Sequence, residues 1–67
     1  MMEIQINGQR RPVDDGVSLA VLVDSLGLAR DRVAVERNRE IVRRQDWEQV
    51  CLAPDDRLEI VHFVGGG

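Results

Sequence analysis

The 67-residue sequence predicts an α+β fold in which a mixed sheet of four to five strands carries one main helix on one face. Three observations support this prediction. A strand-like segment with an Asn-Gly turn opens the chain, one segment of helical period follows it, and short alternating apolar segments fill the second half. A domain of this length buries about 60% of the surface that its unfolded chain exposes, so we expect one thin core.

The N-terminal segment predicts a β-hairpin. Met2 to Ile6 alternates apolar and polar residues, which is the two-residue period of a strand with one buried face. Asn7 and Gly8 tolerate the positive φ angles of a type I′ turn, and Gln9 to Val13 can then form the return strand. Pro12 has no N–H group to donate, so we expect this second strand at an edge of the sheet.

The next segment predicts a helix that begins at Leu19, because Ser18 can accept a hydrogen bond from its free N–H groups. Apolar residues then recur at i, i+3, i+4 and i+7, which places them on one face of about two turns. These residues are Leu19, Leu22, Val23 and Leu26. Gly27 suits the left-handed residue that ends a helix, with Leu28 folding back onto the last turn. The apolar face must pack on the sheet.

The second half of the chain predicts the remaining strands. We expect a third strand at Val33 to Glu36 and a very short fourth strand at Ile41 to Val42. Asp46 to Glu48 is expected to be a helical turn that lays Trp47 over the core, and Leu58 to Val64 the last strand. A right-handed crossover through the helix places the first and last strands side by side and parallel, which is the β-grasp arrangement.

Composition narrows the possible functions. Twelve acidic and nine basic residues give a formal net charge of -3 and a pI near 4.9, which argues against a nucleic-acid partner. The N-terminus shows no secretory signal and no apolar run is long enough to span a bilayer, so we expect a cytoplasmic protein without a membrane partner. One cysteine and one histidine cannot form a structural zinc site, and no metal site or catalytic set is predicted. Cys51 has apolar neighbours and is expected to be buried and inert, while His62 is expected to have a structural role.

Three consecutive glycines, Gly65, Gly66 and Gly67, are the most specific feature of the sequence. At a usage of about 7% per position, such a run arises by chance roughly once in three thousand. Without β-carbons these residues can thread a narrow channel, and they reach roughly 10 Å when extended. We expect residues 1–64 to form the domain and residues 65–67 a flexible tail with a reactive carboxylate. A cloning scar or an inert frayed end is the alternative.

The chain resembles the ThiS family, the sulfur carriers of thiamine biosynthesis within the ubiquitin-like β-grasp superfamily. The resemblance covers nearly the whole chain and is most specific at its end. It rests on Asn7-Gly8, the helix from Ser18 to Leu28, the segments 33–38 and 40–42, and the segment from Asp56 to Gly67. It implies that an E1-like adenylyltransferase of the ThiF type uses ATP to adenylate Gly67. A persulfide enzyme then supplies sulfur for a thiocarboxylate, and thiazole synthase of the ThiG type accepts it. The resemblance implies a protein cosubstrate with no bound cofactor, not an enzyme.

The last strand also predicts a docking site. If Leu58 and Ile60 face the helix, Val61 and Phe63 are exposed apolar residues directly before the tail, and such patches often contact partners. The alternative is that both residues belong to the core in another register. Two other functions stay open: the small subunit of molybdopterin synthase, and a ubiquitin-like interaction or modifier domain without sulfur chemistry.

Overall fold

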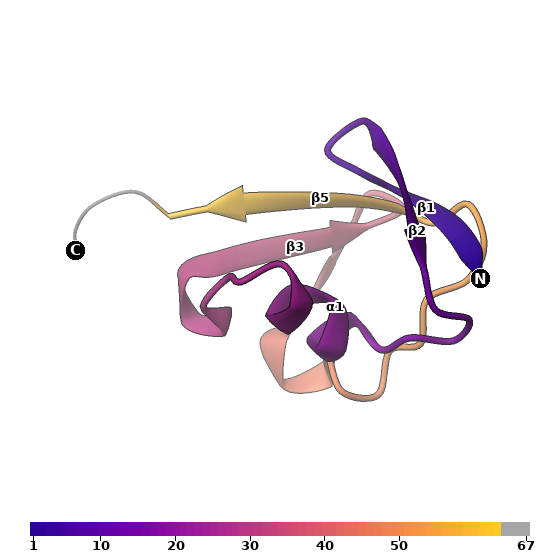
Figure 1. The fold of residues 1–67 in the computed structure, drawn as a ribbon. Coiled ribbons are helices and arrows are strands. Elements are labelled where there is room, and N and C mark those ends of the chain that lie inside the picture. The colour runs from indigo at the N-terminus through magenta and orange to yellow at the C-terminus, as the bar shows by residue number, and fades with distance from the viewer. Residues whose placement is uncertain (64–67) are drawn as a thin grey trace.

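The computed structural model of the protein describes residues 1–63 and shows one five-stranded mixed sheet with one α-helix (Figure 1). The strands lie in the order β2-β1-β5-β3-β4. Their bounds are β1 Met2–Ile6, β2 Gln9–Val13, β3 Val33–Arg37, β4 Glu40–Val42 and β5 Arg57–His62. The helix α1 spans Leu19–Ser25, and the short 3-10 helices η1 and η2 span Arg30–Arg32 and Arg44–Asp46. The predicted fold class is confirmed.

The N-terminal hairpin forms as predicted. β1 pairs antiparallel with β2, and the turn between them has φ angles of 50° at Asn7 and 83° at Gly8. β2 lies at an edge of the sheet, where the missing N–H group of Pro12 is tolerated. Alternation along β1 turns its apolar side chains into the core, and the buried residues are Met2, Ile4 and Ile6.

Both ends of α1 are formed by the residues that the sequence predicted. The Ser18 hydroxyl accepts a hydrogen bond from the Val21 N–H at 3.1 Å. Gly27 has a φ of 75°, and the Leu28 N–H donates to the Val23 carbonyl at 3.4 Å, as in a Schellman motif. The helix covers one face of the sheet (Figure 1) and buries Leu19, Ala20, Leu22 and Val23. The opposite face has no such cover among the described residues.

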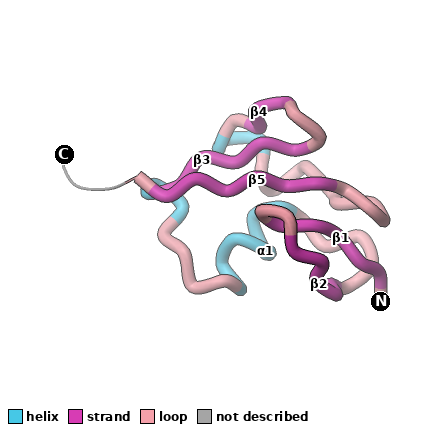
Figure 2. Tube along the Cα trace, turned by 90° about the horizontal axis from the view of Figure 1, so that it is seen from above, coloured by secondary structure: helices cyan, strands magenta, loops and turns pink. Residues whose placement is uncertain are grey.

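β5 lies at the centre of the sheet. It pairs parallel with β1 and antiparallel with β3, and Figure 2 shows it between these two strands. The predicted parallel pairing of the first and last strands in the middle of the sheet is therefore confirmed. Twelve buried hydrophobic residues form the described core, and all of them lie between Met2 and Leu58. On β5, Leu58 belongs to this core and Ile60 packs against it, while Val61 and His62 are exposed.

The helical turn beside Trp47 is displaced from its predicted position. The 3-10 helix spans Arg44–Asp46 rather than Asp46–Glu48, and Trp47 ends it. Trp47 is nevertheless buried, as predicted, and its indole N–H donates to the Val42 carbonyl at 2.9 Å. The Arg44 guanidinium lies 5.9 Å from the centre of the indole ring. Because the 3-10 helix starts at Arg44, the guanidinium of this residue lies over the Trp47 ring.

The prediction that Cys51 is buried was wrong, because its side chain is exposed. Cys51 forms an isolated antiparallel bridge with Ser18, so the backbone around it is extended. In extended backbone, neighbouring side chains point to opposite sides. Leu52 takes the core side with 3% exposure, and Cys51 faces solvent.

Candidate functional site

The predicted functional site begins where β5 ends. β5 pairs with β3 as far as His62, and the Phe63 N–H donates to the Arg32 carbonyl at 2.8 Å. The strand starts one residue before its predicted start and ends at the exposed His62, while Val64 lies outside the described residues. The predicted tail, Gly65 to Gly67, also lies outside them. The chain therefore approaches the tail from the central strand, which Figure 1 shows running away from the β1–β2 hairpin.

Apolar side chains gather on the uncovered face of the sheet. Val61 is 57% exposed and Phe63 is 51% exposed, whereas Leu58 is buried and Ile60 packs against the core. The predicted alternation along the last strand is thus confirmed. Ile41 on β4, which the sequence analysis did not single out, is 75% exposed. We call Ile41, Val61 and Phe63 the outer apolar patch.

An acidic pair lies next to the outer apolar patch. Glu36 on β3 is directly opposite Glu59 on β5, and on its other side Glu36 is opposite Ile41. Paired residues of neighbouring strands point to the same face, so these side chains share the uncovered face. Like charges that lie directly opposite each other destabilise a sheet. The face therefore combines apolar surface with negative charge at a cost to stability.

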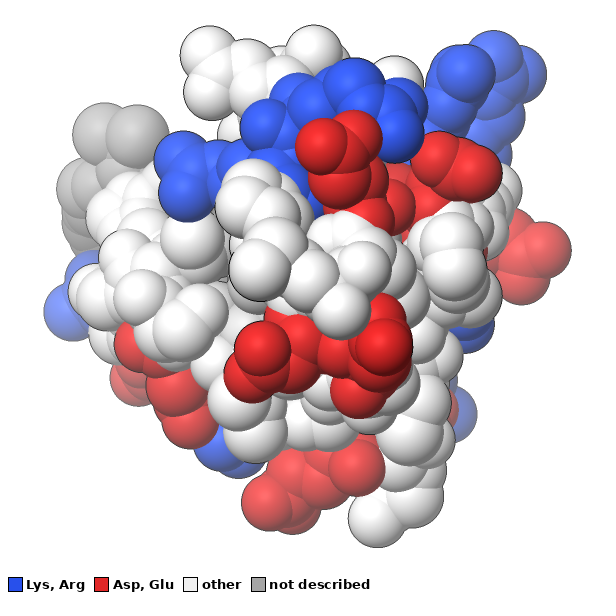
Figure 3. All heavy atoms as spheres, turned by 45° about the vertical axis from the view of Figure 1, so that its right-hand side comes forward, with Lys and Arg blue, Asp and Glu red and all other residues white. Residues whose placement is uncertain are grey.

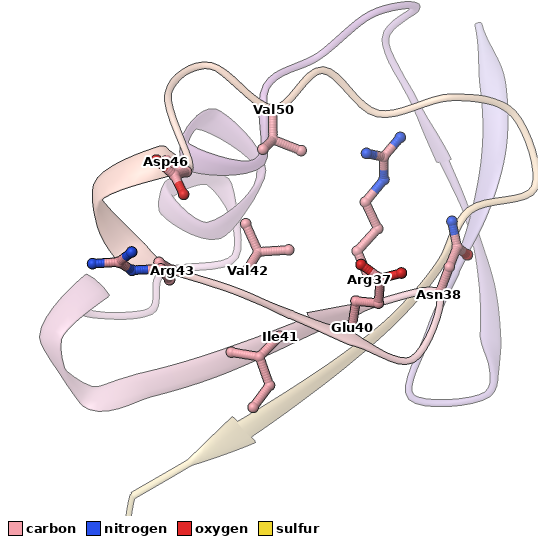
Figure 4. Close-up of a pocket in the computed structure, with 8 residues that line it drawn as sticks. All are labelled: Arg37, Asn38, Glu40, Ile41, Val42, Arg43, Asp46 and Val50. Atoms are coloured by element: carbon pink, nitrogen blue, oxygen red, sulfur yellow. The ribbon is translucent and has the colours of Figure 1, made fainter.

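A hollow of about 310 Å³ lies on the other side of the β3–β4 hairpin. Figure 4 shows Val42 and Val50 pointing into it, while Ile41 points away from it. Arg37 also lines the hollow, but its Nε donates to the Asp56 carboxylate at 2.9 Å. The charge of Arg37 is therefore already compensated by Asp56. The direction of the Ile41 side chain assigns it to the uncovered face.

Asp56 connects the turn before β5 with the β3–β4 hairpin. Its buried carboxylate accepts hydrogen bonds from the Ala53 N–H at 2.8 Å, from Asn38 Nδ2 at 3.1 Å and from Arg37 Nε at 2.9 Å. The Asn38 Oδ1 in turn accepts from the Arg57 N–H at 2.9 Å. Sequence reasoning identified Asp56 only as a turn residue, since Arg37 and Asn38 lie 19 and 18 positions away in the chain.

The environment of Asp56 keeps its carboxylate ionised. Burial by itself acts to raise the pKa of this carboxyl. The hydrogen bonds from Ala53, Asn38 and Arg37 together outweigh that effect, so the pKa of Asp56 lies below its usual value. The carboxylate is thus a fixed hydrogen-bond acceptor at neutral pH, and it holds the beginning of β5.

The other charged groups of the described residues form no second candidate site. Within residues 1–63, no three side chains of His, Cys, Asp or Glu are arranged to hold a metal ion. The single α-helix of this part of the chain has seven residues and is too short to span a membrane. On the side shown in Figure 3, arginine side chains lie against acidic ones. Among the ion pairs, Arg10 contacts Glu3 at 2.8 Å and Asp55 at 3.1 Å.

The fold and the site together define a ubiquitin-like β-grasp domain whose central strand leads into an exposed apolar patch on the uncovered face of the sheet. Comparison with known proteins identifies the family. The chain belongs to the ThiS family, whose model matches residues 4–67.

Individual relatives agree with this assignment. The chain is 41% identical to sulfur carrier protein ThiS of Bacillus subtilis, over 96% of this chain and 98% of that protein. The crystal structure of a thiamine biosynthesis protein (ThiS) from Geobacter metallireducens superposes with a TM-score of 0.83 at 29% identity, covering 98% of this chain and 100% of that one. The chain is also 44% identical to a thiazole synthase of Magnetococcus marinus, of which it spans only 20%.

Proposed function

We propose that this chain is a sulfur carrier for thiamine biosynthesis and that Gly67 carries the sulfur as a thiocarboxylate. Similarity over the whole length of the Bacillus subtilis sulfur carrier carries this proposal. The family match supports it further, because the match runs through Gly65, Gly66 and Gly67. In this proposal residues 1–64 are a rigid platform and residues 65–67 are the part that enters partner enzymes.

The proposed chemistry takes place at the terminal carboxylate, which is a poor electrophile until it is activated. An E1-like adenylyltransferase of the ThiF type would use ATP to convert the Gly67 carboxylate to an acyl adenylate. The terminal sulfur of an enzyme persulfide would then attack the acyl adenylate and release AMP, which leaves an acyl disulfide between Gly67 and the enzyme. A second thiol would reduce this S–S bond by forming a disulfide with the enzyme sulfur, and Gly67 would leave as the thiocarboxylate. The chain contributes the carboxylate and a recognition surface, so it acts as a cosubstrate and not as a catalyst. ATP belongs to the partner.

Thiazole synthase of the ThiG type is the proposed acceptor of the sulfur. Proteins named thiazole synthase from Magnetococcus marinus and Paramagnetospirillum magneticum each contain a segment similar to 98% of this chain, and that segment is 20% of their length. A carrier-like segment within the same polypeptide as a named thiazole synthase supports a direct contact between the two activities. This similarity favours thiazole synthase over molybdopterin synthase as the acceptor.

Reconstitution with purified partners tests the proposed function. The full chain is incubated with the cognate adenylyltransferase, ATP, a persulfide donor and a thiol reductant, and its intact mass is measured. We expect first the mass of the adenylate and then the mass gain of one sulfur replacing one oxygen. Absence of both species with an active adenylyltransferase would disprove the proposal. Attachment of the chain to lysine side chains of other proteins would instead support a modifier.

We propose that the outer apolar patch docks on the adenylyltransferase. Replacing the exposed Val61 by Ser is expected to raise the KM for the carrier about five- to tenfold, because a half-exposed apolar contact at an interface contributes about 1 kcal/mol or more. The turnover number should stay unchanged, since the tail is intact. Initial rates of adenylation over a range of carrier concentrations measure both constants.

Val21 provides a matched control for this variant. It is 56% exposed, against 57% for Val61, but it lies on α1, which packs on the opposite face of the sheet. Val21→Ser should therefore leave the KM unchanged. Equal KM values for Val61→Ser and the unmodified chain would show that docking uses another surface.

A further inference from the structure

The two edges of β5 are held differently. On the β3 side, backbone pairing continues from Arg37 opposite Leu58 to Val33 opposite His62. On the β1 side, the paired residues are only Gln5–Arg57 and Ile6–Leu58, because β1 then turns away into the hairpin. Backbone pairing on this side therefore stops several residues before β5 ends.

The side chain of Asn7 continues the pairing where the β1 backbone stops. The Gln5 N–H donates to the Asp56 carbonyl at 2.8 Å, and the Asn7 N–H donates to the Leu58 carbonyl at 2.9 Å. Two residues further along β5, Asn7 Nδ2 donates to the Ile60 carbonyl at 3.1 Å, and the Ile60 N–H donates to Asn7 Oδ1 at 2.8 Å. The carboxamide thus takes the place of one further residue of β1.

Asparagine is well suited to this position for two reasons. Its carboxamide holds one acceptor and one donor group on a short side chain, so it can satisfy both the N–H and the carbonyl of Ile60. Asn7 also has a φ of 50°, in the left-handed region that asparagine tolerates better than most residues. Aspartate would keep the acceptor without the donor, and glycine would keep only the turn.

We propose that Asn7 is a positioning residue that fixes the direction in which β5 leaves the sheet and so presents the tail to the adenylyltransferase. This inference rests on the proposed function. Ile60 lies seven positions before Gly67, and the patch residues Val61 and Phe63 follow it directly. A strand bonded along one edge can twist about that edge, and bonds on the second edge remove this freedom. A strand end that is already ordered in the free protein loses less conformational entropy when the partner binds.

The test compares Asn7→Gly with a control at the other asparagine turn. Gly keeps the positive φ of the β1–β2 turn and removes the carboxamide. Asn38 has a φ of 51° in the β3–β4 turn, and its side chain bonds Asp56 and the Arg57 N–H at the start of β5. Asn38→Gly therefore loosens the opposite end of the same strand. Both variants are assayed at a temperature where circular dichroism shows them folded.

Two readouts separate positioning from general stability. In Asn7→Gly we expect the Ile60 amide to exchange its hydrogen about tenfold faster and the KM for the carrier to rise about fivefold, with an unchanged turnover number. The turnover number is unchanged because the enzyme holds the carboxylate once the tail is bound. Asn38→Gly should lower stability but leave the KM unchanged. Asn7→Asp, which keeps the acceptor, should give intermediate values.

Three results would overturn the positioning role: unchanged Ile60 exchange in Asn7→Gly, an unchanged KM in that folded variant, or the same rise in KM for both glycine variants. Failure of the proposed function gives a different result, because the unmodified chain would then not be adenylated at all. In that case the exchange of the Ile60 amide still shows whether Asn7 holds the strand end.

Discussion

Deletion of Gly66 and Gly67 is expected to abolish adenylation and to leave the fold intact. The proposed reaction takes place at the terminal carboxylate, and the deletion shortens its reach by roughly 7 Å at about 3.3 to 3.6 Å per residue. The described core lies between Met2 and Leu58, and glycine contributes no side chain to packing. Adenylation is measured as carrier-dependent exchange of pyrophosphate into ATP, and stability as urea unfolding followed by circular dichroism.

An extended chain provides the control for this deletion. Adding one bulky residue after Gly67 keeps all three glycines but moves the terminal carboxylate to a residue whose side chain a narrow channel cannot accept. This variant should be as inactive as the deletion and as stable as the unmodified chain. If either variant is still adenylated at the normal rate without being trimmed, Gly67 is not the carrying residue.

Replacement of Asp56 by Asn is expected to produce the largest loss of stability, about 2 to 3 kcal/mol at pH 7. The substitution removes the charge that accepts from Arg37, and its new amide group faces donors instead of acceptors. Hydrogen bonds to charged groups contribute about 1.5 to 3 kcal/mol. A chain of this length is stabilised by only about 3 to 10 kcal/mol in total, so the loss is a large fraction. Urea unfolding measures the change.

The stability difference between the unmodified chain and Asp56→Asn should depend on pH. Because the pKa of Asp56 is lowered in the folded state, its carboxylate stabilises the fold at every pH above its unfolded pKa. That contribution is lost as the pH falls through the folded pKa, where the folded carboxylate also takes up a proton. The difference in unfolding free energy between the unmodified chain and Asp56→Asn should therefore have its full value at pH 7 and decrease below about pH 4.

The neighbouring aspartate is a matched control. Asp55 contacts Arg10 at 3.1 Å, but its side chain is 78% exposed, and such surface pairs contribute about 0 to 1 kcal/mol. Asp55→Asn should change the free energy of unfolding by less than about 1 kcal/mol. A difference between the unmodified chain and Asp56→Asn that stays constant from pH 7 into the acid range would contradict the assigned role of the Asp56 charge.

The elements that the sequence predicted correctly are those specified by nearby residues. Asn7 and Gly8 form the first turn, Ser18 caps the helix, and Gly27 ends it, each through bonds or φ angles within a few positions. The alternation along the last strand likewise predicted the exposure of Val61 correctly. The docking role of this residue and the reactive role of the tail stay predictions.

The predictions that were wrong or absent concern residues whose surroundings come from segments distant in the sequence. Cys51 has apolar neighbours in sequence, yet its bridge with Ser18 decides which way its side chain points. Ile41 was passed over because a very short strand has too few residues to show an alternation, and only the pairing with β3 assigns it to the uncovered face. Local patterns cannot report such orientations.

The nature and order of the elements follow from the chain alone, because helix caps, tight turns and two-residue alternation act over a few neighbouring positions. The long-range hydrogen bonds do not. Asn7 bonds Ile60 across 53 positions and Asn38 bonds Asp56 across 18. These contacts depend on the register in which separate strands meet, and the register is settled when the whole sheet packs on the helix.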